Sequence, residues 1–170
     1  NERRTTNNVM FKIKANYSEQ FEVRATAEKV REFFADVRNF VEKMPNIESI
    51  KTQPDGTALW TIKAQIPILG SMTEKFAVRL AENSANLIEY SPAPQETKNF
   101  LRYAADFEEQ AGGKTRVNIS QTVEIRRNKA SELHFLAGLA GETLISNEMQ
   151  KRVSAMIKTF LEKARKKLEE

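Results

Sequence analysis

The feature that most constrains the fold is one long apolar stripe near the C-terminal end of the chain. Its side chains recur at spacings of three, four and seven residues, which is the pattern of one face of an amphipathic helix. The stripe consists of Leu136, Leu139, Ala140, Thr143, Leu144, Val153, Met156, Ile157, Phe160, Leu161, Ala164 and Leu168. From Gly141 to Leu168 such a helix is about 40 Å long at 1.5 Å per residue. A helix of that length spans the whole of a sheet packed against it.

The middle of the chain alternates between apolar and polar residues, which predicts strands with one buried face. Six such segments lie at 47–52, 57–66, 75–80, 87–91, 99–108 and 116–125. Turn signals such as Pro54-Asp55-Gly56 and Gly112-Gly113 separate them. This arrangement predicts an antiparallel sheet with one solvated face. In the segment 99–108, Phe100 and Tyr103 cannot both face inward on a regular strand, a conflict that a bulge would resolve.

The first part of the chain predicts one more strand and two short helices. Odd-numbered apolar residues mark a strand over 9–23, and Glu19 interrupts them, which indicates two strands or a bulge between residues 16 and 20. Thr26 is a favourable N-cap, and the spacing changes there to a helical one. Two short helices joined near Asp36 are expected before Pro45.

Length and composition restrict the class of protein. The 170 residues indicate one domain, at 9–170, after a polar tail at 1–8 that has no apolar anchor. Cysteine is absent, which excludes disulfides, iron–sulfur clusters, thiolate zinc sites and a cysteine nucleophile. The apolar runs fall far short of the roughly 18 residues that cross a bilayer. We therefore expect a cytoplasmic protein.

The net charge of +4 comes from the two ends of the chain. Residues 149–170 hold seven basic residues against three glutamates, whereas the stretch 15–148 is mildly acidic. Single-stranded nucleic acid is usually held in a basic groove interleaved with aromatic residues. No nucleic-acid partner is expected.

The order of the predicted elements resembles the helix-grip fold, an α+β fold in which a curved antiparallel sheet of six or seven strands wraps round a long C-terminal helix. From about residue 11 to 168 the chain resembles the START-related, birch-pollen-allergen-like and polyketide-cyclase-like (SRPBCC) superfamily. The most specific match is the entry motif at 23–36, where Glu28, Val30, Phe34 and Asp36 agree with many members. Arg31 stands where tryptophan is common.

A second resemblance concerns one branch of that superfamily, the CoxG-like proteins associated with carbon-monoxide dehydrogenase. The stretches 44–48, 68–70 and 136–141 look like those of this branch. Pro-Asn-Ile stands in place of the branch's Pro-Gly-Val turn, and the helix opening is one residue short between its glycines. Members of the branch are thought to bind a lipophilic ligand or membrane and to assist a redox enzyme. The resemblance therefore implies a ligand carrier with a client enzyme.

Catalytic chemistry has little support in the sequence. His134 is the only histidine, and Glu132 lies two residues away, a poor spacing for shared coordination. Gly112-Gly113 precedes a strand and not a helix, which is a hairpin turn rather than a phosphate-binding loop. We expect no catalytic residues, no metal site and no cofactor.

The inward faces of the sheet and the helix predict the binding site. A concave sheet is not filled completely by one helix, which favours an apolar cavity with a few polar anchors. Buried Gln121 would need a partner there, either protein, water or ligand. The predicted ligand-binding residues are Trp60, Ile62, Phe76, Val78, Tyr90, Tyr103, Phe107, Ile119, Gln121, Val123, Leu144, Val153, Met156 and Ile157.

Two surface features suggest contact with a membrane. Ile68 and Leu69 lie in an apolar loop tip, either folded over the core or exposed as a lid or membrane contact. Lys158, Lys163, Arg165, Lys166 and Lys167 form a basic end of the C-terminal helix. These lysines and arginines complement the helix dipole, and they could also touch anionic lipid.

Three functions remain open at this point. The first is non-enzymatic binding or transport of a hydrophobic small molecule, such as a lipid or quinone, in a cytoplasmic or membrane-associated protein. The second is an enzyme of the polyketide cyclase, aromatase or dehydratase type, which is favoured if His134 or Glu132 faces the pocket. The third is a protein-interaction or co-chaperone module, which predicts a filled core.

Overall fold

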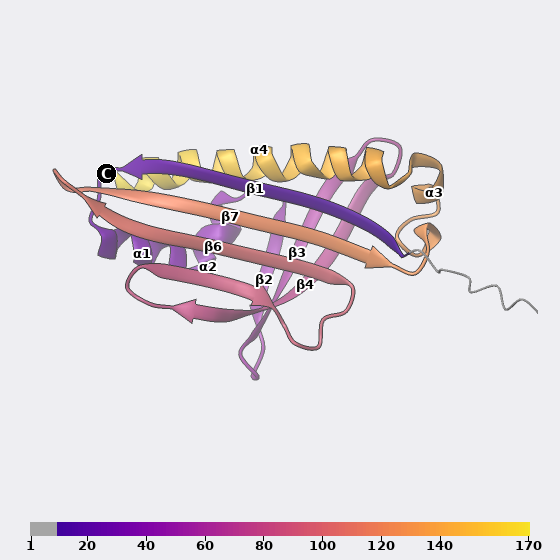
Figure 1. Ribbon diagram of the computed structural model, residues 1–170, viewed down its shortest axis with the longest axis horizontal. Helices are drawn as coiled ribbons and strands as arrows, with labels where there is room; N and C mark the ends of the chain where they lie inside the picture. Colours follow the sequence, from indigo (N-terminus) through magenta and orange to yellow (C-terminus); the bar gives the residue numbers. More distant parts are fainter. Residues whose placement is uncertain (1–9) are drawn as a thin grey trace, which may run out of the picture.

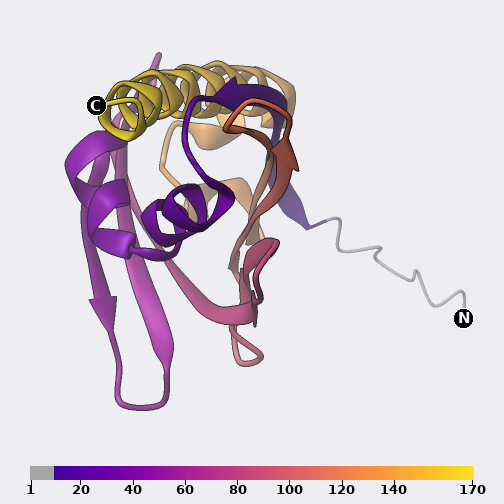
Figure 2. The same ribbon diagram turned by 90° about the vertical axis from the view of Figure 1, so that its left-hand side faces the viewer.

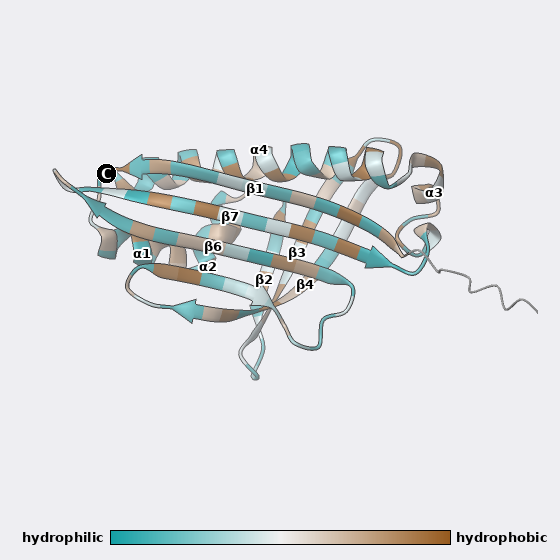
Figure 3. Ribbon diagram, in the orientation of Figure 1, coloured by the Kyte–Doolittle hydropathy of each residue, from teal (hydrophilic) through white to brown (hydrophobic). Residues whose placement is uncertain are grey.

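The sheet follows from the alternating segments of the sequence. In the computed structural model, which describes residues 10–170, seven antiparallel strands form one sheet. They are β1 (Phe11–Val23), β2 (Ile47–Thr52), β3 (Thr57–Ile66), β4 (Gly70–Asn83), β5 (Leu87–Pro92), β6 (Asn99–Gln110) and β7 (Lys114–Arg127). The spatial order is β1-β7-β6-β5-β4-β3-β2, so β2 to β7 form a meander and β1 extends it beside β7. The alternation of hydropathy is visible along β1, β6 and β7 (Figure 3).

One long helix lies in the curve of the sheet. This helix, α4 (Glu142–Leu168), begins after Gly141, whose φ of 83° is easily adopted only by glycine. The sheet curls round α4, with β1 along one side of the helix and the β2–β4 part on the other (Figures 1 and 2). The helix-grip α+β fold predicted from the order of elements is confirmed.

Short helices lie at both ends of the sheet (Figure 1). At one end, α1 (Ala27–Ala35) is capped by the Thr26 hydroxyl, which accepts a hydrogen bond from the Lys29 N–H at 3.3 Å. Next to it, α2 (Val37–Lys43) is capped by the Asp36 carboxylate, which accepts from the Arg38 N–H at 3.0 Å. At the other end lie a 3₁₀-helix (Ala130–Glu132) and α3 (Ala137–Ala140).

Side chains of α4 cover the free edge of β1. Three of them, four residues apart, accept hydrogen bonds from backbone N–H groups of β1 that are two residues apart. The pairs are Lys12 to Glu142 at 2.9 Å, Lys14 to Ser146 at 3.2 Å and Asn16 to Gln150 at 2.8 Å. Four helical residues advance about 6 Å and two strand residues about 6.7 Å, so the two repeats stay nearly in step over this length. An edge that would otherwise be open to pairing with another chain is thereby occupied.

Neither predicted irregularity in β1 and β6 is present. β1 pairs with β7 residue by residue from Phe11 to Val23, and it tolerates Glu19 because that carboxylate is partly exposed and accepts a hydrogen bond from the Tyr17 hydroxyl. β6 is also regular: Tyr103 faces inward, while Phe100 faces outward under the Arg126 guanidinium, 4.3 Å from its ring centroid. The prediction of a bulge near residues 16–20 was therefore wrong. The tail predicted at 1–8 lies outside the described residues.

Candidate functional site

Aromatic side chains fill the part of the interior next to α1 and α2. Phe40 of α2 lies with its ring centroid 5.2 Å from Phe160 of α4, 5.2 Å from Tyr103 of β6 and 5.4 Å from Trp60 of β3. Phe34 of α1 packs edge-on against Phe160 at 5.9 Å. All five side chains are buried. Contacts of this density make this half of the interior packed core.

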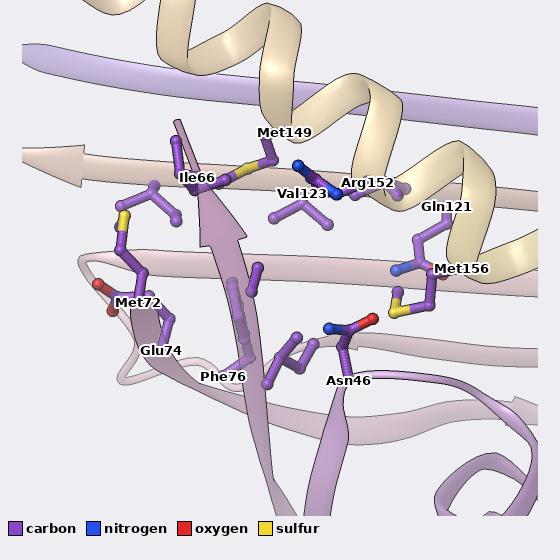
Figure 4. A pocket seen from close by; sticks show the side chains of 14 residues that line it. Asn46, Ile66, Met72, Glu74, Phe76, Gln121, Val123, Met149, Arg152 and Met156 are labelled. Atoms are coloured by element: carbon purple, nitrogen blue, oxygen red, sulfur yellow. The ribbon is translucent and has the colours of Figure 1, made fainter. Parts of the chain in front are cut away.

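An apolar cavity of about 60 Å³ lies between the middle of α4 and strands β3, β4 and β7 (Figure 4). Its apolar lining residues are Ile62, Ala64, Ile66, Met72, Phe76, Val123, Ile125, Met149, Val153 and Met156, and its polar ones are Asn46, Glu74, Gln121 and Arg152. The cavity has room for a few water molecules. Any larger occupant has to displace part of the wall.

Gln121 is the buried polar group of this cavity. Only 3% of the residue is exposed, and its side chain makes no hydrogen bond to any other residue in the range 10–170. The regular β1–β7–β6 pairing holds it on the concave face, opposite Tyr17 on one side and Tyr103 on the other. Its amide atoms are not fully enclosed but face the cavity, where water or a ligand can supply the hydrogen bonds that the protein does not.

Two polar atoms within the described residues are fully enclosed and lack a hydrogen-bond partner. They are the indole Nε1 of Trp60 and the hydroxyl of Tyr103, both on residues that are about 1% exposed. Burial raises the pKa of the Tyr103 hydroxyl well above its ordinary value. This hydroxyl therefore stays protonated and is available as a donor.

The two charged groups of the lining differ in how they are paired. The Glu74 carboxylate accepts from the Arg127 guanidinium and from the Asn99 amide, each at 2.9 Å. Arg152, on the exposed side of α4, makes no ion pair and no side-chain hydrogen bond to the residues 10–170. The charge of Glu74 is therefore compensated, and that of Arg152 is not.

The structure divides the predicted ligand-binding residues between cavity and core. Six of them line the cavity: Ile62, Phe76, Gln121, Val123, Val153 and Met156. Seven are buried but do not line it: Trp60, Val78, Tyr90, Tyr103, Phe107, Ile119 and Ile157. Leu144 is 38% exposed, because the first turn of α4 turns Ile145 inward instead. Leu139, also part of the predicted stripe, is 81% exposed.

Some lining residues were absent from the prediction. Ala64, Ile66 and Ile125 continue inward-facing stripes that the alternation had already defined, and Met149 lies four residues before Val153 on α4. Arg152 and Asn46 gave no such signal. Arg152 belongs to the polar border of the helix, and Asn46 lies in a turn with a φ of 75°.

The acid–base candidates lie outside the cavity lining. His134 accepts a hydrogen bond from the Leu136 N–H on Nδ1 at 3.0 Å and stacks on Phe135 with centroids 4.6 Å apart. The Glu132 carboxylate accepts from the Asn128 N–H at 3.1 Å. Both interactions hold the connection between β7 and α3. Residues 10–170 contain no group of three acidic or histidine side chains placed to hold a metal ion.

The apolar turn between β3 and β4 splits the two residues predicted for membrane contact. Leu69 is 5% exposed and packs into the core, whereas Ile68 is 54% exposed. Ile68 has a φ of 75°, which is a strained conformation for a β-branched residue. The turn protrudes past α4 (Figures 1 and 2). None of the helices in residues 10–170 combines the length and the apolar character that crossing a bilayer requires.

Comparison with known proteins gives matches in structure alone. No protein-family model and no curated protein sequence matches the chain. The di-domain ARO/CYC BexL from the BE-7585A biosynthetic pathway matches with a TM-score of 0.61 and 17% identity, over 93% of this chain and 51% of BexL. The chain thus spans about half the length of that di-domain protein.

Two structures that match over nearly their whole length are also similar to this chain. The Zhui aromatase/cyclase from Streptomyces sp. R1128 has a TM-score of 0.59 and 13% identity, over 89% of this chain and 93% of Zhui. TTHA0849 from Thermus thermophilus has a TM-score of 0.56 and 15% identity, over 88% of this chain and 96% of that one. The likeness shows that the chain shares its fold with these aromatase/cyclases. No comparison supports the CoxG-like branch.

Proposed function

We propose that the protein binds a hydrophobic small molecule, such as a lipid or a quinone, between the sheet and α4 without catalysing a reaction on it. The observation that carries the proposal is Gln121, an almost completely buried amide that faces an apolar cavity and has no partner within residues 10–170. An apolar pocket with a few convergent polar groups is the usual form of a ligand site. A ligand with a hydrogen-bonding group and an apolar body would satisfy both parts.

The small volume of the cavity is consistent with an adaptable site. Three of its lining residues are methionines: Met72 of β4 and Met149 and Met156 of α4 (Figure 4). Methionine side chains are unbranched and have several rotatable bonds, so they repack around an occupant at little cost. We expect the ligand to enter by displacing these side chains, and the aromatic core around Phe40 to stay in place.

Native mass spectrometry of the freshly purified full chain tests the proposal, followed by organic extraction of what it carries. Ala64→Phe places a ring in the cavity, and Ala104→Phe places the same ring on the outer face of β6 as a matched control. We expect the ligand to be present in the wild type and the control, and to be lost in Ala64→Phe. A ligand-free mass, with no thermal shift from lipids or quinones, would favour the protein-interaction module instead.

The matched aromatase/cyclases favour one alternative, an enzyme that works through polar cavity residues. Gln121, Asn46 and Arg152 would then orient the substrate, because neither His134 nor Glu132 lines the cavity. Incubation with a poly-β-ketone thioester tests this alternative. An aromatic product formed by the wild type and not by Gln121→Leu would establish it, and unchanged substrate would exclude it for that substrate class.

We also propose that contact with a membrane, for ligand exchange or beside a client enzyme, is made by Ile68. The protruding turn supports this assignment, and the basic last turn of α4, towards the other end of the helix in Figure 1, supplies positive charge for anionic lipid. Insertion of one apolar tip, with electrostatic attraction, gives weak and reversible binding to anionic lipid. Co-sedimentation with phosphatidylglycerol-containing vesicles should weaken for Ile68→Asp and persist for Val41→Asp, which changes an exposed apolar residue of α2.

A further inference from the structure

We infer that the ligand is an anionic amphiphile whose carboxylate is held at the cavity mouth by the Arg152 guanidinium and the Gln121 amide. This inference rests on the proposed function and specifies the class of its ligand. Its starting point is the charge balance of the cavity lining, which contains one compensated carboxylate and one uncompensated guanidinium.

Arg152 is turned to the cavity although a partner is available to it on the helix. Glu148 lies four residues earlier, the spacing at which opposite charges usually pair along a helix. The Glu148 carboxylate is instead joined to Lys151 at 3.1 Å. Arg152 therefore reaches the lining without an ion pair to any residue in the range 10–170.

The acidic residue of the lining does not balance this charge. Glu74 and Arg127 form an ion pair at 2.9 Å, with side chains only 19% and 10% exposed. Asn99 completes the group, since its amide donates to Glu74 and its carbonyl oxygen accepts from Arg127 at 2.8 Å. Because the negative charge of Glu74 is neutralised within this group, the remaining lining carries one positive charge, that of Arg152. This charge favours an anionic ligand.

The donors around the mouth suit a carboxylate. Arg152, Gln121 and Asn46 all line the cavity, with the end of the Arg152 side chain beside Met149 and the two amides on the side of Met156 (Figure 4). A guanidinium presents paired N–H groups that match the two oxygens of a carboxylate, and an amide can supply a further donor. The apolar body of the ligand would then lie against Met149 and Met156.

The position of Arg152 also favours a charged head group on energetic grounds. Because Arg152 lies on the exposed side of α4, its charge and that of a bound carboxylate stay partly hydrated. The large desolvation cost of a fully buried ion pair is thereby avoided. Only the apolar part of the ligand has to leave water completely.

Titration calorimetry with matched charged and neutral ligands tests the inference: decanoate against 1-decanol, and 2-naphthoate against 2-naphthol. Arg152→Met removes the charge and keeps an apolar stem, and Lys163→Met makes the same change at an exposed residue of α4 that does not line the cavity. For Arg152→Met we expect the Kd of both carboxylates to rise about tenfold, which corresponds to about 1.4 kcal/mol. The Kd of the alcohols should stay unchanged, and Lys163→Met should alter neither the carboxylates nor the alcohols.

Two results would overturn the inference in distinguishable ways. Neutral ligands that bind as tightly as the carboxylates, with no effect of Arg152→Met, would refute the anionic class and leave the proposed function standing. If none of the four ligands binds, both the inference and the proposed function are refuted. Decyl phosphate serves as the third head group, and tighter binding than decanoate would refute the carboxylate assignment. Arg152→Gln, checked by circular dichroism, provides a second variant if Arg152→Met fails to fold.

Discussion

Replacing Gln121 by leucine should stabilise the ligand-free protein, although the residue is almost completely buried in the middle of a strand. Leucine has nearly the same volume and removes an amide that has no partner within residues 10–170. A buried polar group without a hydrogen bond costs about 1–3 kcal/mol. Water in the cavity would recover part of this cost, so we expect a gain of about 1–2 kcal/mol in the free energy of unfolding. For a chain of this size that raises the Tm by about 2–6 °C.

Thr115→Val is the matched control, because Thr115 lies on the same face of β7 and is completely buried. Its hydroxyl donates to the Ala25 carbonyl oxygen at 2.7 Å. Valine preserves the shape and leaves that carbonyl without its partner, so we expect a loss of about 1 kcal/mol. The two variants thus change one buried polar group each, with opposite signs.

Both variants are measured by thermal and urea unfolding of protein freed of lipid by organic extraction and refolding. The expected order of stability is Gln121→Leu, then wild type, then Thr115→Val. Ligand affinity should follow a different order, with Gln121→Leu weakest. If Gln121→Leu loses as much stability as Thr115→Val, the amide has a structural partner, and the reasoning that assigns it to a ligand is refuted.

Three other perturbations test separate parts of the structure. Tyr103→Phe removes the unpartnered hydroxyl, so the Tm of the ligand-free protein should be unchanged or higher; a drop of several degrees in differential scanning calorimetry would mean that the hydroxyl is satisfied. Ile68→Gly relieves a positive φ at a β-branched residue and should add about 1 kcal/mol to the urea unfolding free energy; a loss would show that Ile68 packs against the fold. Hydrogen bonds from Arg38 lower the pKa of Asp36 below 3.8, so its contribution is present above that pH and lost as the pH falls through the lower folded value; Asp36→Asn, which keeps the cap, should flatten the dependence of Tm on pH there, and an unchanged slope would contradict this.

Most of the fold could be predicted because its signals are local. Alternation with period two gives the strands, the side chain of Thr26 begins α1, and the turn at Gly56 separates β2 from β3. The helix expected from Gly141 to Leu168 begins one residue later, at Glu142, whereas the first residues of the stripe, Leu136, Leu139 and Ala140, lie before it in or beside α3. Each of these signals depends on residues close together in the chain, so no knowledge of the tertiary structure is needed to interpret them.

Departures from the predictions arise where a tertiary contact outweighs the local pattern. Glu19 would break an isolated stripe, but one-to-one pairing with β7 and a hydrogen bond from Tyr17 keep β1 regular. Phe100 is apolar and yet faces outward, where Arg126 covers its ring. In the first turn of α4, Ile145 is buried and Leu144 is not, a choice that depends on how the helix lies against the sheet.

By itself the sequence determined which face of most strands and of most of α4 is buried, because burial follows a short period along the chain. It also placed Gln121 on an otherwise apolar inward face. Only the tertiary structure decided which part of the interior is filled. Phe40 and Phe160 lie 120 residues apart in sequence and meet in the part of the interior next to α1 and α2, while the side chains against the middle of α4 leave a cavity. A cavity is the difference between the space that several elements enclose and the side-chain volumes they bring to it, so no single segment of sequence contains it.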